Sequence, residues 1–283
     1  MRSLKQALTN RVLLTDGRLD PWLTRQPLKV ERDFFGAEGI LPVLNLTRRH
    51  SVGEAHRAYL QAGADVIRCN SHGASPLTLG PLGLGDDAFC INYAAAEIAS
   101  AAVDSLPGQG RRRFVLGVVD DEGWHAAAQD IEDAAALQSE AMIAGGADAI
   151  AFAALPEDTA RRQAFLRGAE RGKAALAADV PLYVFQEHGH GPGFGSGETG
   201  CICFFDGSEE SAFLASPILH RRKVNLTGGG DSPAVTARLD ALLRQVAEDG
   251  LRPFRGPLRP EISEDPEVPS SVGHLEPVQR AWG

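Results

Sequence analysis

The segment 41–73 constrains the fold more than any other part of the chain, because it joins a helix, a glycine stop and a short apolar strand. Apolar side chains recur at helical spacing over 52–59, and Gly63 follows where a helix C-terminus favours a positive φ. Val66 then begins an apolar run that ends in four polar residues, Cys-Asn-Ser-His, at 69–72. This order is one step of a βα repeat, and such folds place their chemistry at the carboxyl ends of the strands.

The helix-to-strand junction of this segment occurs twice in the chain. Ala-Gly-Ala-Asp-Val-Ile at 62–67 returns as Gly-Gly-Ala-Asp-Ala-Ile at 145–150. The same small residues and the same aspartate therefore precede an apolar strand at two places. The repetition predicts two equivalent βα units that pack in the same way.

Helices alternate with near-continuous apolar strands along most of the chain, a pattern typical of α/β proteins with a covered parallel sheet. The expected strands are 11–15, the run from Val66, 113–119, 144–152, 180–185 and 223–227, and the later helices are 91–104, 127–143, 159–178 and 233–247. Because fewer than eight strands are convincing, we predict a (β/α)8-type barrel, incomplete or distorted, over residues 1–249. An open doubly wound sheet is the alternative. Residues 250–283, rich in Pro, Glu and Arg, are expected to form an extended C-terminal tail.

Composition argues against several classes of function. A net charge of −9 and a pI near 5.4 disfavour a nucleic-acid partner, whose phosphates are neutralised by Lys and Arg. No stretch reaches the roughly 20 apolar residues of a membrane span, and the first residues lack the apolar core of a signal peptide. We therefore expect a cytoplasmic protein without a membrane partner. Four cysteines in 283 residues do not make a disulfide framework.

Two strand ends carry polar side chains that suit a small-molecule site. Asp16 and Gly17 close the first strand, where Asp16 either acts on a substrate or caps the turn that Asp-Gly favours. Asn70 and His72 follow the second strand and either line the same mouth or hold its loop by hydrogen bonds. We predict Asp16 and Asn70 as catalytic residues, with Gly17 and His72 in substrate binding.

Two later turns supply further candidates for substrate binding. Asp120 opens an acidic run that could also bind a divalent cation, although such a run is more often a solvated loop. Gly228 and Gly229 belong to a glycine triplet expected to be a tight turn, which could cradle an anion at the N-terminus of the following helix.

A Gly-rich loop expected at 187–207 carries two imidazoles and two thiols, a chemically sufficient set for tetrahedral zinc. These residues are His188, His190, Cys201 and Cys203. Their spacing matches no standard zinc motif, and the alternation over 201–204 equally suits a buried strand. Zinc at this non-standard set is the one cofactor that the residues suggest.

Several blocks of the chain resemble the homocysteine S-methyltransferase family of zinc-dependent barrels. The blocks are Leu14-Thr15-Asp16-Gly17, Leu44-Asn45-Leu46-Thr47, the stretch from His56 to Ile67 with Asn70, Phe114-Val115-Leu116-Gly117 and Gly145-Gly146-Ala147-Asp148. The block over 44–70 is the most specific, and the resemblance covers about residues 10–240. It implies a barrel that transfers a methyl group to the homocysteine thiol, held as a thiolate by zinc on three cysteines.

The chain departs from that family at positions to which the resemblance assigns function. The family has Asn-Cys at one strand end and Gly-Gly-Cys-Cys before a Pro-led helix, whereas residues 225–230 before Pro233 match both motifs in part and contain no thiol. An acidic residue that meets the amino-acid end of homocysteine falls at Ala153. The Glu-Thr-Asn after the second strand reads Arg-Cys-Asn at 68–70. Loss of the metal ligands and a substrate carboxylate together indicates a changed role.

Two functions are compatible with these departures. The first is a divergent enzyme that transfers a methyl group to a small thiol or related acceptor without the three-cysteine zinc site, the acceptor being activated by another metal or a local base. The second is a non-catalytic paralogue that acts as a binding or regulatory subunit. A partner subunit or a second copy of the chain would complete the barrel in that case.

Overall fold

The computed structural model describes residues 4–10, 12–106, 112–119, 126–152, 158–184, 202–205 and 226–248. Its strands are β1 (Leu13–Thr15), β2 (Val66–Arg68), β3 (Phe114–Val119), β4 (Ala149–Phe152), β5 (Leu182–Val184), β6 (Ile202–Phe205) and β7 (Leu226–Gly229). The longer helices are α5 (Arg49–Gln61), α7 (Ala88–Asp104), α8 (Ala128–Ala144), α9 (Thr159–Ala175) and α12 (Pro233–Glu248). The shorter ones are α1 (Leu4–Asn10), α2 (Asp20–Leu23), α3 (Val30–Asp33), α4 (Leu44–Thr47) and α6 (Pro76–Leu79), with 3-10 turns η1 (Leu41–Val43), η2 (Gly80–Leu82) and η3 (Gly85–Asp87). The predicted alternation of strands and helices is confirmed.

The seven strands are parallel and form one sheet in the order β5-β4-β3-β2-β1-β7-β6. β7 pairs with β1, with Thr15 opposite Gly228, so the segment that matched two motifs occupies the place of a barrel's closing strand. This cyclic order differs from a doubly wound sheet, whose strand order reverses at a switch point. In the described part of the chain β5 and β6 are the two edges, so the sheet is a half-barrel.

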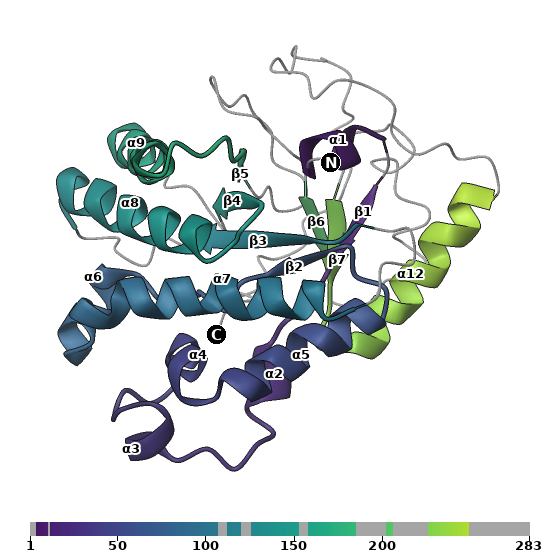
Figure 1. Cartoon of the computed structure of the whole chain (residues 1–283), viewed down its shortest axis with the longest axis horizontal. Coiled ribbons are helices and arrows are strands. Elements are labelled where there is room, and N and C mark those ends of the chain that lie inside the picture. The colour runs from purple at the N-terminus through teal and green to yellow at the C-terminus, as the bar shows by residue number, and fades with distance from the viewer. Residues whose placement is uncertain are drawn as a thin grey trace, which may run out of the picture.

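The two faces of the sheet bury different clusters. The inner face carries Leu13, Val66, Phe114, Leu116, Val118, Ala149, Ala151, Tyr183 and Leu226, packed against Leu4, Ala7 and Leu8 of α1. The outer face packs against α5, α7, α8 and α9, and Figure 1 shows these helices along one side of the sheet with α1 on the other. None of the helices described is long and apolar enough to cross a membrane. Helices on one face and an apolar plug on the other are the layers of a βα barrel.

The repeated junctions form two equivalent units, as the sequence predicted. Gly63 and Gly146 both end their helices with a positive φ, 112° and 104°. A carboxylate oxygen of Asp65 accepts the N–H of a β1 residue at 3.0 Å, and Asp148 accepts the N–H of a β3 residue at 2.9 Å. Each aspartate therefore joins the start of its own strand to the strand before it.

The predicted tight turn over 228–230 is wrong, because Gly228 and Gly229 belong to β7. A Cβ on Gly228 would stand 2.4 Å from the carbonyl oxygen of Thr15, so glycine here permits a close approach of two strands. The turn begins at Gly230, whose φ is 82°. The loop predicted over 187–207 also needs correction, because it contains β6, as the alternating pattern over 201–204 allowed.

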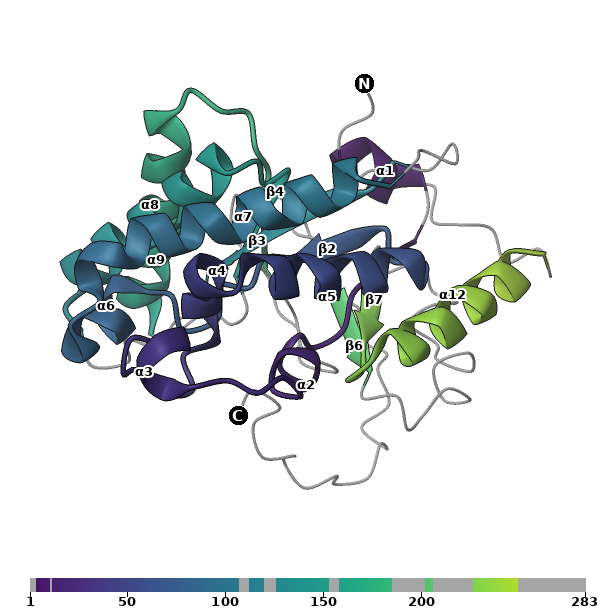
Figure 2. The ribbon, with the colours of Figure 1, turned by 60° about the horizontal axis from the view of Figure 1, so that its bottom comes forward.

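The long segment between β1 and α5 carries α2, α3, η1 and α4. Figure 2 shows α2 and α3 below α5 and α4 beside it. Asp33, a buried residue of α3, anchors this segment. Its carboxylate accepts bonds from Arg48 Nε at 2.8 Å and Arg32 Nε at 2.9 Å, and both guanidinium groups lower the pKa of Asp33. The anchored segment places η1 beside the carboxyl end of β2.

Candidate active site

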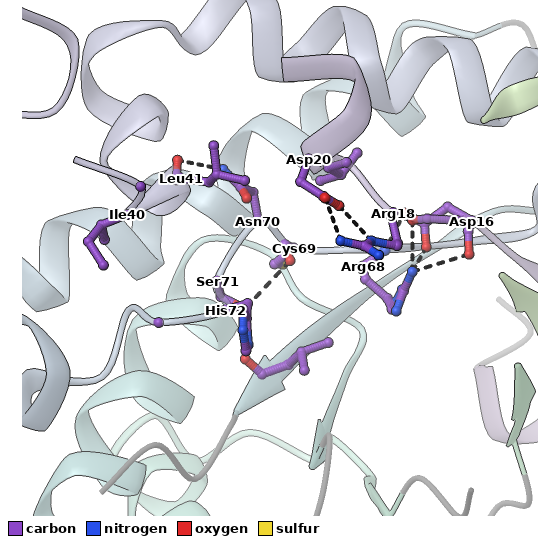
Figure 3. Close-up of a pocket in the computed structure, with 15 residues that line it drawn as sticks. Asp16, Arg18, Asp20, Ile40, Leu41, Arg68, Cys69, Asn70, Ser71 and His72 are labelled. Carbon is purple, nitrogen blue, oxygen red and sulfur yellow. Dashed lines mark hydrogen bonds and ion pairs between the residues drawn. The ribbon is translucent and has the colours of Figure 1, made fainter. Parts of the chain in front are cut away.

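A cavity of about 250 Å³ opens at the carboxyl ends of β1, β2 and β3. Its walls come from 16–20, 39–41 and 68–73, with Val118 of β3. Figure 3 shows a charged side and an uncharged side of this opening. The charged side is formed by Asp16, Arg18, Asp20 and Arg68, and the uncharged side by Ile40, Leu41 and Asn70.

Asp16 is fully buried, and both of its carboxylate oxygens are hydrogen-bonded within the protein. Oδ1 accepts from Arg68 Nε at 2.9 Å and from the Thr15 hydroxyl at 3.2 Å, and Oδ2 accepts from the Arg68 backbone N–H at 3.0 Å. Burial raises the pKa of Asp16, and the charge of Arg68 opposes that shift. This buried carboxylate therefore holds the Arg68 side chain in place at the cavity wall.

Arg68 is the cation of the inner wall. Because side chains alternate along a strand, Arg68 lies on the same inner face as Val66, two residues earlier in β2. Its Nη2 donates to the carbonyl oxygen of Gly17 at 2.7 Å and to that of Asp16 at 3.3 Å, and only 10% of its side chain is exposed. The ion pair and these bonds fix the guanidinium at the cavity wall.

Arg18 and Asp20 form a second, half-exposed ion pair at the mouth. Arg18 Nε and Nη2 donate to the two carboxylate oxygens of Asp20 at 2.9 and 2.6 Å. Both backbone polar groups of Arg18 are hydrogen-bonded. Its N–H donates to the Gly230 carbonyl oxygen at 2.8 Å, and its carbonyl oxygen accepts from the Tyr59 hydroxyl at 2.6 Å. The loop after β1 is thus joined to β7 and to α5.

Asn70 holds the loop after β2 by hydrogen bonds, which was one of the two roles considered for this residue from the sequence. Its Nδ2 donates to the Leu41 carbonyl at 3.1 Å and to Asn45 Oδ1 at 3.0 Å. Asn45 Nδ2 returns a bond to the Asn70 carbonyl at 2.8 Å. The pair of amides joins β2 to η1 and α4, while a catalytic role for Asn70 stays a prediction.

The remaining polar residues of the β2 loop differ in accessibility. Ser71 is buried and donates from its hydroxyl to the Val118 carbonyl at 2.7 Å, whereas His72 is exposed at the rim. Cys69 packs into the outer-face core, where burial raises the pKa of its thiol well above the usual value. Cys69 is therefore a neutral, buried side chain, and His72 is the accessible titratable group of this loop.

The structure brings Asp16, Gly17, Asn70 and His72 into one cavity lining, while the other candidates lie elsewhere. Gly228 and Gly229 end β7 beside β1 and are outside that lining. Four candidates fall outside the described residues: Asp120, His188, His190 and Cys201. Cys203 lies in β6, of which the structure describes the backbone.

The described residues do not fit a zinc site made of three thiolates. Cys69 is buried in the core and Cys90 is exposed on α7. Within the described ranges, no three His, Cys, Asp or Glu side chains come together as metal ligands would. At the end of β7 a side chain on residue 228 would collide with Thr15. This strand end therefore has no room for a thiol at 228 unless β1 moves.

Sequence reasoning assigned no role to Arg18, Asp20 or Arg68. One signal was available, because Arg68 directly follows the apolar residues of a buried strand. A charge in such a place requires a partner. Asp16, at the end of the neighbouring strand, was the obvious candidate for that partner.

The family model for homocysteine S-methyltransferase matches residues 13–185, more than half of the 283-residue chain. The chain belongs to the homocysteine S-methyltransferase family. Two curated relatives are the methionine synthases of Mycobacterium leprae and Mycobacterium tuberculosis, which are 28% and 29% identical to it over 186 residues. These matches cover 64% of this chain and 15% of each relative. The chain thus corresponds to a small part of those enzymes.

Solved structures of the same family share the fold. The homocysteine methyltransferase MmuM from Escherichia coli, in its metallated form, superposes with a TM-score of 0.61 at 17% identity, over 82% of this chain and 96% of MmuM. Its apo form gives a TM-score of 0.57 at 16% identity, over 84% and 98%. The parallel half-barrel formed by the described residues is therefore similar to the fold of MmuM.

Proposed function

We propose that this family member transfers a methyl group to a small thiol or a related acceptor, bound in the cavity at the ends of β1, β2 and β3. The observation that carries the proposal is the cavity, which lies where βα barrels place their chemistry and has polar groups on its wall. The names of the relatives, methionine synthase and homocysteine methyltransferase, support a methyl-transfer reaction.

The reaction is proposed to run without the family's three-cysteine zinc site, which the described residues do not fit. The thiol then needs another route to the thiolate, which is the form that attacks a methyl group. His72, accessible at the rim, is the candidate base, because an imidazole exchanges protons near neutral pH. The positive charge of Arg68 favours the thiolate further.

In the proposed step the thiol proton passes to His72, and the sulfur electron pair forms the new S–C bond. The methyl donor keeps the electron pair of the bond that breaks. Asp16 and Asn70, which hydrogen-bond to the protein, act as positioning residues for Arg68 and for the β2 loop.

The test is a methyl-transfer assay with homocysteine, a panel of sulfonium and N-methyl donors, and detection of the methylated thiol by mass spectrometry. His72→Ala should lower kcat about 100-fold and remove the rise of rate with pH that a general base produces. His50→Ala is the matched control, because His50 is an exposed histidine of α5 that is not among the residues lining the cavity. No product with any donor, together with no thiol binding by calorimetry, would contradict the proposal and favour the non-catalytic alternative.

Metal content is a separate measurement on the untagged full chain. Turnover without stoichiometric zinc supports the proposal. Stoichiometric zinc that disappears when His188→Ala and Cys201→Ser are combined would instead support zinc at the non-standard set, and the base mechanism would be abandoned.

A further inference from the structure

Three successive backbone carbonyls of the loop after β1 accept hydrogen bonds from side chains of other elements. The carbonyl oxygens of Asp16 and Gly17 accept from Arg68 Nη2 at 3.3 and 2.7 Å. The next one, that of Arg18, accepts from the Tyr59 hydroxyl at 2.6 Å. Arg68 belongs to β2 and lines the cavity, whereas Tyr59 belongs to α5 and is not among the lining residues. A residue outside the cavity therefore holds one point of its wall.

Tyr59 is suited to keep this carbonyl in a fixed place. The residue is 0% exposed and belongs to the outer-face cluster that contains Leu60 and Ile67. Burial, and after it the charge of Asp16, raise the pKa of the Tyr59 hydroxyl, so this group keeps its proton and donates throughout the neutral range. A packed aromatic ring has few rotatable bonds, and its hydroxyl therefore directs the acceptor with little freedom.

The backbone of Arg18 supports an ion pair at the mouth of the cavity. Its N–H donates to the Gly230 carbonyl oxygen at 2.8 Å, so its two backbone groups are bonded to α5 and to the residue after β7. The Arg18 side chain donates to both carboxylate oxygens of Asp20, at 2.9 and 2.6 Å, and Figure 3 shows this pair at the opening. The position of the pair thus depends on the bonds that hold the backbone of Arg18.

The wall that carries the candidate base, His72, has supports of its own. The hydroxyl of Ser71 donates to the Val118 carbonyl in β3 at 2.7 Å. The amides of Asn70 and Asn45 join the same loop to η1 and α4. Because these bonds involve the β2 loop and the α5 hydroxyl bonds to the β1 loop, loss of that hydroxyl should displace the β1 loop more than the β2 loop.

We propose that Tyr59 is a positioning residue that sets the place of the Arg18–Asp20 pair at the mouth, and through it the affinity for the acceptor. Its part in the reaction rests on the proposed function. Its part in holding the wall rests on the hydrogen bonds alone. Tyr59→Phe removes the donor and keeps the ring, so it separates the hydrogen bond from the packing of the core.

Hydrogen exchange of the full chain, measured by mass spectrometry, tests whether the wall is held. In Tyr59→Phe the peptide that contains residues 16–20 should exchange about fivefold faster, while the peptide that contains β3 should be unchanged. Tyr93→Phe makes the same change at an exposed tyrosine of α7 that does not line the cavity, and should alter neither peptide. Unchanged exchange over 16–20 in Tyr59→Phe would overturn the inference. An equal rise over β3 would also overturn it, because the variant would then only be less stable overall.

Methyl-transfer kinetics with homocysteine test the part in the reaction. In Tyr59→Phe the KM should rise about fivefold, while kcat stays within about twofold because the loop that carries His72 is held separately. A fall in kcat at unchanged KM, or no change in either constant, would refute the part in acceptor binding.

The two measurements distinguish this inference from the proposed function. If exchange over 16–20 rises as expected and the unsubstituted chain methylates no thiol, the positioning of the wall by Tyr59 stands and the methyl-transfer proposal fails. If the unsubstituted chain turns over and Tyr59→Phe changes neither exchange nor KM, methyl transfer stands and the inference is refuted.

Discussion

Replacing Arg68 with methionine tests whether the buried carboxylate of Asp16 depends on the positive charge of Arg68. Asp16 is 0% exposed, and in Arg68→Met it loses the 2.9 Å bond from Nε and the opposite charge. It keeps the bonds from the backbone N–H of residue 68 and from the Thr15 hydroxyl. Removing one partner of a buried pair costs about 3–5 kcal/mol. Because two bonds remain, we expect a loss of about 3 kcal/mol in the free energy of unfolding at pH 7.

The pH dependence of this loss identifies its cause. Burial already raises the pKa of Asp16, and loss of Arg68 raises it further. A carboxyl group whose pKa is higher in the folded than in the unfolded state destabilises the fold at high pH, and this penalty fades as pH falls through the folded pKa. The cost of Arg68→Met should therefore be smaller at pH 5 than at pH 7.

Urea unfolding followed by circular dichroism measures both effects. Adding Asp16→Asn to Arg68→Met should recover most of the stability, because no buried charge is then left alone. Arg49→Met, a surface substitution, should change the free energy of unfolding by about 0.5 kcal/mol or less. A loss below about 1 kcal/mol for Arg68→Met, or an equal loss at both pH values, would refute the reasoning.

Three further predictions concern stability. His56 is buried without a hydrogen-bond partner in the described part of the chain, and burial lowers its pKa to about 4. The free energy of unfolding should therefore fall by up to about 3 kcal/mol from pH 6.5 to pH 4, and His56→Leu should flatten that slope in urea titrations. Gly168→Ala would place a Cβ 2.3 Å from an α8 carbonyl and should cost about 1–3 kcal/mol. Thermal unfolding should show no such loss for Gly80→Ala, where nothing lies within 4 Å. Asp65→Ala and Asp148→Ala should each cost about 1–3 kcal/mol, more at Asp65, which is 1% exposed; an equal or smaller loss at Asp65 would argue against the shared role.

The repeated units were predictable from sequence because their signals are local. A glycine that ends a helix, an aspartate and an apolar strand follow one another within six residues, and both copies adopt the same conformation around Gly63 and Gly146. The partner of each aspartate was not predictable, because the bonded N–H belongs to a strand far away in the chain. Local chemistry therefore predicted the units but not the contacts between them.

The candidate site was predictable only in part, for the same reason. Asp16 and Asn70 were found from their positions at strand ends, and the structure places both at the cavity. Their hydrogen-bond partners come from other strands and turns, so sequence spacing could not show that Arg68 pairs with Asp16. Gly228 was misassigned because a glycine that permits a tight turn and one that permits close strand approach have the same local signature.

The plug formed by α1 has a kinetic consequence. Leu4, Ala7 and Leu8 belong to the inner-face cluster, which includes the first residues of β1, β2, β3, β4 and β7, whereas the described cavity opens at the carboxyl ends of β1, β2 and β3. Under the proposed function, a methyl donor, its acceptor and both products would share that opening. The molecule nearer the rim would then have to leave before the deeper one could exchange, which predicts an ordered sequence of binding and inhibition by the outer product.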